Sequence, residues 1–569
     1  MSTDQQKKTR PNVSRRKFLR GVGLVSAQMI VAACAKNAAT TEPTQVTAAA
    51  TQAPATQVRA TEVRATQAPP TQVPTLIKPS QDIIMGIGSD MKIMDPRIQV
   101  GAQVFNQTLP VLEPLLFADN AGEFKGVLAS SWEPLPDHSG WKFHLRPGIE
   151  FDNGEPFNAE AVKFSIDSVL DPANESWVHA DPRSRMNGIR EVVAEDDSTV
   201  VFLTESWNLM LPPQFRNQPI LPPKYAAQQG KGFGVNPVGT GRYKFVEYVP
   251  GSHLHLEAKP GYSGQWDWDG VAKNDSLTFR YLAESATRVA ALEAGEVHII
   301  DNVSPDVLDR IRENPGLEVV SGPTARINGM FCNCGREPFN DVNARKAVAH
   351  AIDKEALVAT IMGGLTDVAT EPMTAGTLGT VGEAFAPYEY DLAKAKQYFE
   401  KAGLSNGTKI KIGGPVGRYI NDKQVTTAVA SMLIEVGFDV EIEQLEWGTY
   451  WTKVTNEEYD LFYVGWCPGA YDPSDFAIVY KGWGDDNAGL THFVEQNERI
   501  VQLYEAGSAA LSREEAREPY TELAHLLWDN LPVVQMFYEP NITAISSKVK
   551  GWSPRRDTQV FLWSAYLEE

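Results

Sequence analysis

The sequence has few of the residues on which enzyme and metal sites depend. Only 4 Cys and 9 His occur among 569 residues, and no Cys/His cluster has the spacing of a structural zinc site. A hydrolase nucleophile elbow and a zinc-protease His-Glu-x-x-His helix are also missing. These absences argue against one class of protein, the secreted hydrolases. Paired carboxylates stay open as a catalytic device in a chain with 72 Asp and Glu.

Positive charge and long apolar runs are scarce as well. The net charge is −20; residues 1–33 contribute about +6 and residues 34–78 about +2, so the remainder carries about −28. Such a surface repels phosphate backbones, which argues against nucleic-acid binding. After residue 33 no apolar run is long enough to cross a bilayer. The 43% hydrophobic and 22% charged residues are typical of a soluble globular protein, and the length predicts two or three domains.

The first 80 residues are predicted to be an export address followed by a stalk. Basic residues precede a weakly apolar stretch at 21–33, which is typical of a signal peptide (residues 1–33). Residues 14–19 (SRRKFL) resemble a twin-arginine signal, and residues 31–34 (VAAC) resemble a lipobox, so Cys34 is the predicted lipidation site. Residues 34–80, rich in Thr, Ala, Gln and Pro, cannot bury a core and are expected to be disordered.

From residue 82 onward, strand and helix patterns alternate, which indicates an α/β fold. Asn158 is placed to cap a helix, and Asp391 is placed to cap another that Gly403 ends. Residues 408–445 have a strand-helix-strand pattern, which implies parallel strands and a right-handed crossover. A last apolar strand is predicted at 532–537.

Residues 459–476 carry the strongest signal for a binding site. The pattern predicts a buried strand that ends at Trp466, followed by a turn. Ligands of α/β sheets lie at the carboxyl ends of strands. Trp466 and Tyr471 would offer stacking surfaces there, Asp472 a carboxylate, and Trp483 is a further candidate. The alternative is that the aromatic residues are core residues and that Asp472 only begins a turn.

Several blocks of the chain resemble one known family. The blocks are residues 128–134, 143–151, 153–165, 238–245, 338–353 and 466–476. They resemble the family 5 extracellular solute-binding proteins, which are the dipeptide-, oligopeptide- and nickel-binding components of bacterial ABC importers. The resemblance covers essentially residues 82–569. It implies a bilobal α/β fold of the periplasmic-binding-protein type, with two mixed lobes joined by a hinge and one extra inserted domain.

The resemblance also implies domain boundaries and partners. Lobe I would comprise residues 82–117, 237–325 and 534–569, the inserted domain residues 118–236, and lobe II residues 326–533. A solute would be enclosed by hinge closure and delivered to a membrane permease with ATPase subunits. The protein is expected to be an extracytoplasmic monomer anchored to the membrane, in the periplasm or at the cell surface. Neither enzymatic activity nor a cofactor is expected.

The resemblance leaves the solute class open. In the family's peptide binders an Asp usually lies three residues after the Trp that matches Trp466, where it pairs with the peptide ammonium; this chain has Gly469 there, and Asp472 is the candidate substitute. A peptide-like solute is the first expectation, and an oligosaccharide or other non-peptide solute is the rival. A nickel chelate is a lesser alternative, because His253 and His255 share one strand face that is expected away from the cleft, so no metal site is predicted.

Three cysteines follow Cys34, and an oxidising compartment permits them to form a disulfide. Cys332 and Cys334 are too close in sequence to bridge easily within an extended strand. The strands that carry Cys332 and Cys467 are expected in the same sheet. The sequence therefore suggests a disulfide from Cys467 to Cys332 or Cys334, with three buried thiols as the alternative.

Overall fold

The computed structural model describes most of the chain after residue 80. The described residues are 81–98, 101–262, 266, 270–322, 324–374, 376–380, 382–467, 473, 476, 479, 490–493 and 497–568. The predicted signal peptide, Cys34 and the stalk lie outside this range, as do Tyr471, Asp472 and Trp483.

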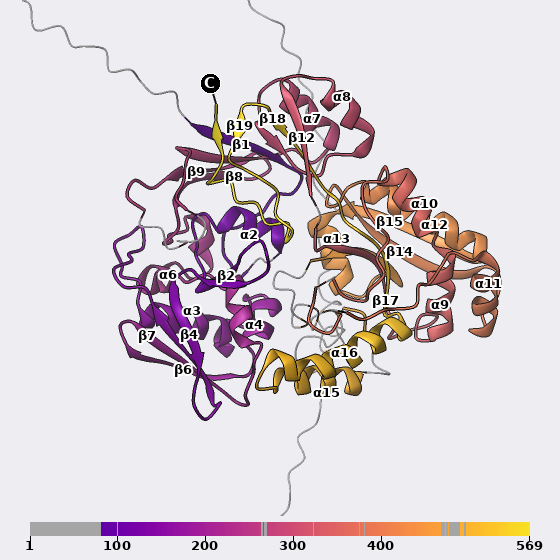
Figure 1. Cartoon of the computed structure of the whole chain (residues 1–569), viewed down its shortest axis with the longest axis horizontal. Helices are drawn as coiled ribbons and strands as arrows, with labels where there is room; N and C mark the ends of the chain where they lie inside the picture. The colour runs from indigo at the N-terminus through magenta and orange to yellow at the C-terminus, as the bar shows by residue number, and fades with distance from the viewer. Residues whose placement is uncertain are drawn as a thin grey trace, which may run out of the picture. The chain divides into compact units, whose positions relative to one another are not determined.

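Lobe I is built on a mixed sheet with the strand order β12-β18-β11-β1-β10-β9-β8. Its strands are β1 (Asp82–Ile87), β8 (Tyr243–Val249), β9 (His253–Ala258), β10 (Ser276–Tyr281), β11 (Ile299–Ile300), β12 (Leu317–Gly322) and β18 (Asn541–Ser546). Around it lie α2 (Ala102–Thr108), α7 (Ser285–Glu293), η4 (Pro305–Val307), α8 (Leu308–Arg312) and the pair β19 (Val549–Lys550) and β20 (Tyr566–Leu567). Figure 1 shows how the sheet joins the indigo β1 to the yellow β18 from the end of the chain.

The inserted domain has its own antiparallel sheet, in the order β4-β5-β7-β6. Its strands are β4 (Ala129–Pro134), β5 (Gly140–Leu145), β6 (Ile189–Asp196) and β7 (Thr199–Thr204), beside the hairpin of β2 (Leu116–Ala118) and β3 (Phe124–Gly126). Its helices are α3 (Ala159–Leu170), η1 (Pro172–Asn174), α4 (Ala180–Met186), α5 (Leu211–Gln214), η2 (Phe215–Asn217), α6 (Pro223–Gln229) and η3 (Gly230–Val235). The predicted cap of α3 is confirmed, since the Asn158 side chain accepts a hydrogen bond from the Ala161 N–H.

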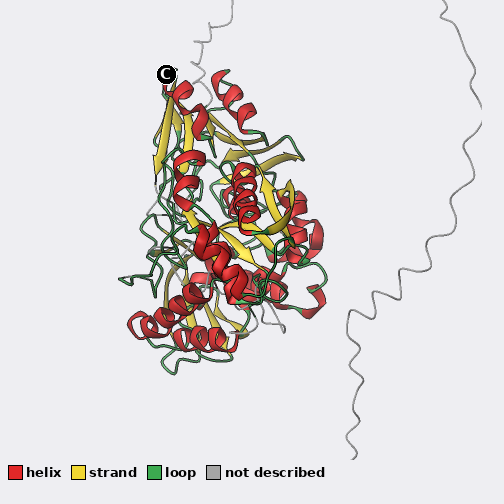
Figure 2. Cartoon of the chain, turned by 90° about the vertical axis from the view of Figure 1, so that its right-hand side faces the viewer, coloured by secondary structure: helices red, strands yellow, loops and turns green. Residues whose placement is uncertain are grey.

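Lobe II contains a second mixed sheet, in the order β15-β14-β16-β13-β17. Its strands are β13 (Ile327–Cys332), β14 (Thr408–Val416), β15 (Phe438–Glu446), β16 (Leu461–Trp466) and β17 (Val533–Tyr538). Its helices are α9 (Val342–Ala351), α10 (Lys354–Ala356), η5 (Leu357–Ile361), α11 (Leu392–Lys401), α12 (Asp422–Val436), α13 (Trp447–Thr455), α15 (Asn497–Ser508) and α16 (Arg513–Asn530). Figure 2, which views the molecule from this side, shows helices lying over the strands. The predicted unit β14-α12-β15 is confirmed, with its strands parallel.

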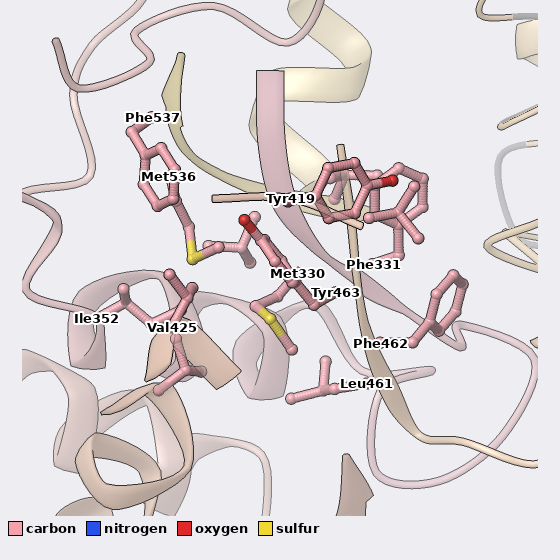
Figure 3. Packing of buried hydrophobic residues seen from close by; sticks show 14 of the residues in the cluster. Met330, Phe331, Ile352, Tyr419, Val425, Leu461, Phe462, Tyr463, Met536 and Phe537 are labelled. Carbon is pink, nitrogen blue, oxygen red and sulfur yellow. The ribbon is translucent and has the colours of Figure 1, made fainter. Parts of the chain in front are cut away.

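The core of lobe II forms between its sheet and the helices, as Figure 3 shows. Met330 of β13, Leu461 and Tyr463 of β16, and Met536 of β17 are fully buried there together with Val425 of α12. Burial of each of the Leu, Val and Met side chains contributes about 1.5–3 kcal/mol. The apolar side chains that predict these strands are therefore the ones whose burial holds β16, the strand that carries Trp466, in the core of lobe II.

One domain boundary differs from the prediction. The sequence places residues 534–538 in lobe I, but β17 pairs antiparallel with β13 and so belongs to lobe II. The chain returns to lobe I only at Glu539 and Pro540, just before β18. An apolar run predicts a buried strand without identifying the sheet that the strand joins, which is why this boundary is displaced.

The suggested disulfide is also wrong. Strands β13 and β16 are neighbours, as expected, but they run antiparallel with Cys332 opposite Leu461 and Ile327 opposite Trp466. Cys467 thus lies about 20 Å along the strands from Cys332, whereas a disulfide needs Cα atoms within about 7 Å. The three described cysteines carry thiols, and burial raises the pKa of the Cys332 thiol.

Candidate solute-binding site

Two segments carry the chain between the lobes, and they lie side by side. One leads from β12 through Thr324 and Arg326 to β13, and the other leads from β17 through Glu539 to β18. The Thr324 hydroxyl donates to the Glu539 carbonyl at 2.5 Å, and the Glu539 N–H donates to the Arg326 carbonyl at 2.9 Å. These hydrogen bonds hold the two crossings together, which is the arrangement expected of a hinge.

A buried ion pair links the side chains of the same two segments. Arg326 Nε lies 2.6 Å from Glu539 Oε2, and the two residues are only 5% and 6% exposed. The Arg326 guanidinium also donates to the Gly465 carbonyl at 3.2 Å and to the Thr558 hydroxyl at 2.8 Å. Burial raises the pKa of the Glu539 carboxyl, and the Arg326 charge opposes this rise. The pair therefore ties both crossings to the end of β16 and to lobe I.

Two further charges approach this pair, one from each lobe. Arg418 follows β14 in lobe II, and its guanidinium lies over the rings of Tyr419 and Trp447 at 4.9 and 5.2 Å. Asp301 follows β11 in lobe I, and its carboxylate lies 3.7 Å from Arg288 Nε. Burial lowers the pKa of Arg418 and raises that of Asp301. Both groups are only partly buried, however, and the Asp301 side chain keeps 29% of its surface exposed.

These charged groups line a cavity between the lobes. Its volume is about 80 Å³, and its walls include Asp301, Trp552 and Gln559 from lobe I, and Arg326 and Arg418 from the lobe II side. Pockets for drug-sized ligands measure about 300–1,000 Å³. The cavity that the described residues enclose therefore fits one small polar group rather than a whole peptide.

The strand end that the sequence singles out lies close to these groups. Trp466 pairs with Ile327, the residue after Arg326, and its partly buried side chain packs against the lobe II core. Cys467 Sγ lies 3.5 Å from the carbonyl of Asp557 in lobe I. The end of β16 therefore meets lobe I at the interlobe boundary, while Tyr471, Asp472 and Trp483 fall outside the described residues.

The sequence analysis named neither Arg326 nor Glu539, and it also missed Arg418 and Asp301. One signal was available, because Arg326 directly precedes the wholly buried β13 and Glu539 directly follows β17. A charge at the edge of a continuous apolar strand is either solvated or paired. The sequence does not reveal the pairing, because it depends on two distant segments crossing at the same place.

The two histidines that were weighed as nickel ligands have other partners. His253 Nε2 lies 3.1 Å from Glu247 Oε1, and His255 Nδ1 lies 2.8 Å from the Thr278 hydroxyl. Both histidines are on β9 of lobe I. Within the described ranges, no group of three or more His, Cys, Asp or Glu side chains is arranged to hold a metal ion.

The sequence analysis is wrong that a nucleophile-elbow motif is missing, because one match exists, but that match lies in the wrong structural context. Residues 403–407 have the letters Gly-x-Ser-x-Gly, but they connect α11 to β14. A nucleophile elbow joins a strand to the helix that follows it. The order of elements around Ser405 is reversed, so this serine is not presented as a nucleophile.

Comparison with known proteins identifies the family. Residues 123–488 match the bacterial extracellular solute-binding proteins, family 5 Middle. The chain belongs to this family. The members are binding proteins of ABC importers rather than enzymes. Among the described residues, no helix is both long and apolar enough to cross a bilayer.

Curated relatives of this family 5 protein match most of its length. The glutathione-binding protein GsiB of Shigella flexneri is 24% identical over 501 residues, which cover 84% of this chain and 93% of the relative. Di/tripeptide-binding protein 1 of Pseudomonas aeruginosa is 26% identical over 435 residues, which cover 71% of this chain and 79% of the relative.

Solved structures confirm the predicted bilobal fold. The periplasmic binding protein DppA from Helicobacter pylori, in complex with the peptide STSA, has a TM-score of 0.76 at 23% identity and covers 86% of this chain and 98% of its own. AgaA from A. tumefaciens R10, in complex with agropinic acid, has a TM-score of 0.76 at 22% identity, and the match covers 86% of this chain and 99% of AgaA. At such identities the likeness shows the fold alone.

Proposed function

We propose that this protein is the solute-binding component of an ABC importer and captures a peptide-like solute between its lobes. The observation that carries the proposal is the interlobe cavity, to which Asp301 of lobe I and Arg418 of lobe II both contribute charge. The names of the relatives, which bind glutathione or di- and tripeptides, support the peptide-like class. A permease with ATPase subunits would be the partner, and a monomer would suffice for this role.

The hinge gives this function a physical basis. The hydrogen-bonded crossings at Arg326 and Glu539 stay together while small rotations about them separate the lobes. Opening parts the walls of the cavity, because Arg418 moves away from Asp301 and Gln559. A solute that contacts both walls binds the closed form better than the open form, and this difference in affinity is what drives closure.

We also propose that a lipid on Cys34 anchors the protein outside the cytoplasm after twin-arginine export. The order of arginine pair, apolar stretch and small residues before Cys34 supports this proposal. Cys34→Ser should move the protein from the membrane fraction to the soluble fraction and abolish labelling by fatty acid. Replacing both Arg15 and Arg16 with Lys should instead retain the precursor inside the cell. A Cys34→Ser protein that stays in the membrane fraction would contradict the anchor.

A non-peptide solute is the second candidate. Gly469 stands where the family's peptide binders usually carry the Asp that pairs with a free peptide N-terminus, so the chain lacks that partner at this position. The related fold of AgaA is solved with agropinic acid, which shows that the architecture serves more than one ligand class. An oligosaccharide belongs to the same alternative.

The test uses the mature chain with Cys34→Ser, incubated separately with di- and tripeptide pools and with cello-oligosaccharide pools. Native mass spectrometry should detect a retained, unaltered peptide, and unfolding should shift to higher temperature. Solute at 100 times Kd adds about 2.7 kcal/mol to the free energy of unfolding. Retention of an oligosaccharide instead would select the second candidate. Cleaved product would contradict a binding protein, and an absence of both retention and thermal shift would contradict solute capture.

A further inference from the structure

The backbones of the two lobes meet at a pair of glycines. Gly88 directly follows β1 of lobe I, and Gly417 directly follows β14 of lobe II. A Cβ atom added to Gly88 would lie only 2.8 Å from the Gly417 carbonyl oxygen, whereas non-bonded carbon contacts are most favourable at about 3.5–4.0 Å. A Cβ atom added to Gly417 would lie 3.2 Å from the carbonyl oxygen of Ala283 in lobe I. The lobes therefore touch here without room for a side chain at position 88.

The backbone conformation of position 88 does not require glycine. Gly417 has a φ of 77°, which favours glycine whatever surrounds it. Gly88 is not among the glycines with positive φ, so an alanine can adopt its conformation. What excludes a side chain at Gly88 is the space taken by its neighbours, and the nearest of these atoms belongs to the other lobe.

On the lobe II side, a buried carboxylate holds the turn that carries the Gly417 carbonyl. Asp422 is the first residue of α12, and its side chain is buried. Its Oδ1 accepts from the Gly417 N–H at 3.2 Å, and its Oδ2 accepts from the N–H groups of Arg418 and Tyr419 at 2.8 and 3.1 Å. Hydrogen bonds to an ionised group are strong, so the turn is held in place against an added methyl group.

On the lobe I side, Arg288 lies behind Gly88. The guanidinium is buried, and its Nη1 lies 3.0 Å from the position of a Gly88 Cβ atom. It donates to the carbonyls of Leu282 and Ala283 at 2.8 and 2.9 Å. Because Arg288 and Gly88 are in one lobe, their spacing stays the same when the lobes move as rigid bodies. The spacing between Gly88 and Gly417 changes with every such movement.

This contact lies beside the interlobe cavity. Arg418 lines the cavity and follows Gly417 in the chain. Asp301 lines the cavity from lobe I, and the Gly88 N–H is one of the groups that oppose the rise in the pKa of its carboxyl. The fit at Gly88 therefore governs how closely the two walls of the cavity approach each other.

We propose that Gly88 is a positioning residue for lobe closure. Its missing side chain lets the lobes approach until the backbones of Gly88 and Gly417 touch, and this contact sets the closed geometry in which both lobes bind a solute. An alanine at position 88 destabilises the closed form far more than the open form, which weakens binding. This inference rests on the proposed function, because it concerns the closure that solute capture requires.

The test measures affinity and stability separately in the mature chain with Cys34→Ser. The di- and tripeptide pool and the cello-oligosaccharide pool are each titrated while tryptophan fluorescence is followed. The apparent Kd for the pool that binds should rise about tenfold in Gly88→Ala, as expected for an overpacked contact, and further in Gly88→Val. The unfolding temperature of Gly88→Ala without solute should change by less than about 2 °C, because the lobe cores are unaltered.

Gly86→Ala is the matched control. Gly86 lies two residues earlier in β1, and its Cβ position is 3.2 and 3.3 Å from side-chain atoms of Ile300 and Leu282, both in lobe I. The control thus adds the same methyl group against the interior of lobe I alone. It should lower the unfolding temperature and leave the apparent Kd unchanged, which is the opposite pattern.

Cross-linking reports closure without any solute. Lys92 of lobe I lies against Gly448 at the start of α13 in lobe II, since a Cβ atom added to Gly448 would overlap the Lys92 ammonium. A short bis-maleimide should therefore join Lys92→Cys to Gly448→Cys in the closed form. Addition of Gly88→Ala should lower the rate of this linkage about tenfold, as measured by mass spectrometry of the linked peptides.

The outcomes separate this inference from the proposed function. Either an unchanged apparent Kd or an unchanged linkage rate in Gly88→Ala overturns the role of Gly88 and leaves solute capture standing. An equal rise in Kd in Gly86→Ala overturns it too, because any change in β1 would then suffice. A Gly88→Ala chain that fails to fold shows that the space serves lobe I itself, which refutes the inference. If the unaltered protein binds neither pool, the proposed function is refuted, and the linkage rate alone decides the role of Gly88.

Discussion

Replacing Trp207 with Phe removes a hydrogen bond that joins the inserted domain to lobe II. Trp207 Nε1 donates to the Ala510 carbonyl at 2.8 Å, and the nearby Leu209 N–H donates to the Ser508 carbonyl at 2.7 Å. Met210 is buried in the same apolar cluster as the core of lobe II. This contact lies where the turn between α15 and α16 meets the loop after β7 (Figure 1). Because the contact joins the inserted domain to lobe II, we expect opening of the lobes to break it.

The expected magnitude follows from the single bond that is lost. A hydrogen bond of this kind contributes about 1 kcal/mol net, and 1.4 kcal/mol corresponds to a factor of ten. The Phe ring keeps most of the stacking on Trp141, whose ring centroid lies 5.0 Å away. The ratio of closed to open protein should therefore fall about fivefold. The apparent Kd for the solute should rise by the same factor if the open form predominates without solute.

The assay is calorimetric titration of wild type and Trp207→Phe with the solute that the wild type retains. Trp177→Phe is the matched control, because the Trp177 indole donates to Asn174 at 3.1 Å inside the inserted domain. This control should lose a similar bond without any change in Kd. Thermal unfolding should change little in Trp207→Phe, because the Phe ring still packs against the core of the inserted domain. An unchanged Kd for Trp207→Phe, or equal changes in both variants, would refute the idea that this contact belongs to the closed form.

Three further predictions concern stability and covalent state. Glu539→Gln should lower the free energy of unfolding by about 3–5 kcal/mol in denaturant titrations, because Arg326 stays buried without its counter-charge. Burial lowers the pKa of Lys354 to about 8 from 10.5. Between these pH values the unfolded chain holds a proton that the folded chain does not, so stability should rise with pH by up to about 3 kcal/mol, and Lys354→Met should remove this rise. Thiol titration of the unfolded mature chain with Cys34→Ser, without reductant, should find three free thiols. Finding only one would show that two of the three cysteines do form a disulfide.

The elements of this fold could be predicted wherever local signals are strong. The pattern of residues 408–445 gives β14, α12 and β15, because helix and strand periodicities differ and Gly437 marks the end of the helix. The capping residues Asn158 and Asp391 were recognisable because their side chains serve backbone groups a few residues away. These signals require no knowledge of the distant parts of the chain.

The predictions failed where distant segments decide the outcome. The sheet that β17 joins, and the register that separates Cys332 from Cys467, both depend on pairing with β13. The signal at Trp466 is local. Aromatic residues at a strand end indicate a ligand crevice, but they do not identify the residues on its opposite side. Asp301 and Gln559 line the interlobe cavity, and each looks like an ordinary loop residue in the sequence. Trp466 is not among the residues that line this cavity, so its role in binding stays a prediction.

The position of the buried charges has a physical explanation in the motion that the fold permits. A buried ion pair is weak evidence for stability, because apolar residues of similar volume often stabilise a protein as well. Arg326 and Glu539, however, lie on the two segments that connect the lobes. Apolar side chains at these positions would let one segment slide along the other, because apolar contacts are not directional. An ion pair with short hydrogen-bonded contacts permits only one register between them. Arg418 and Asp301 differ in kind, because each lies in the cavity wall of its own lobe, and Asp301 pairs with Arg288 of the same lobe. The charges at the crossings are therefore placed to fix the register of the two hinge segments, whereas the charges at the cavity are placed to meet a solute that contacts both lobes.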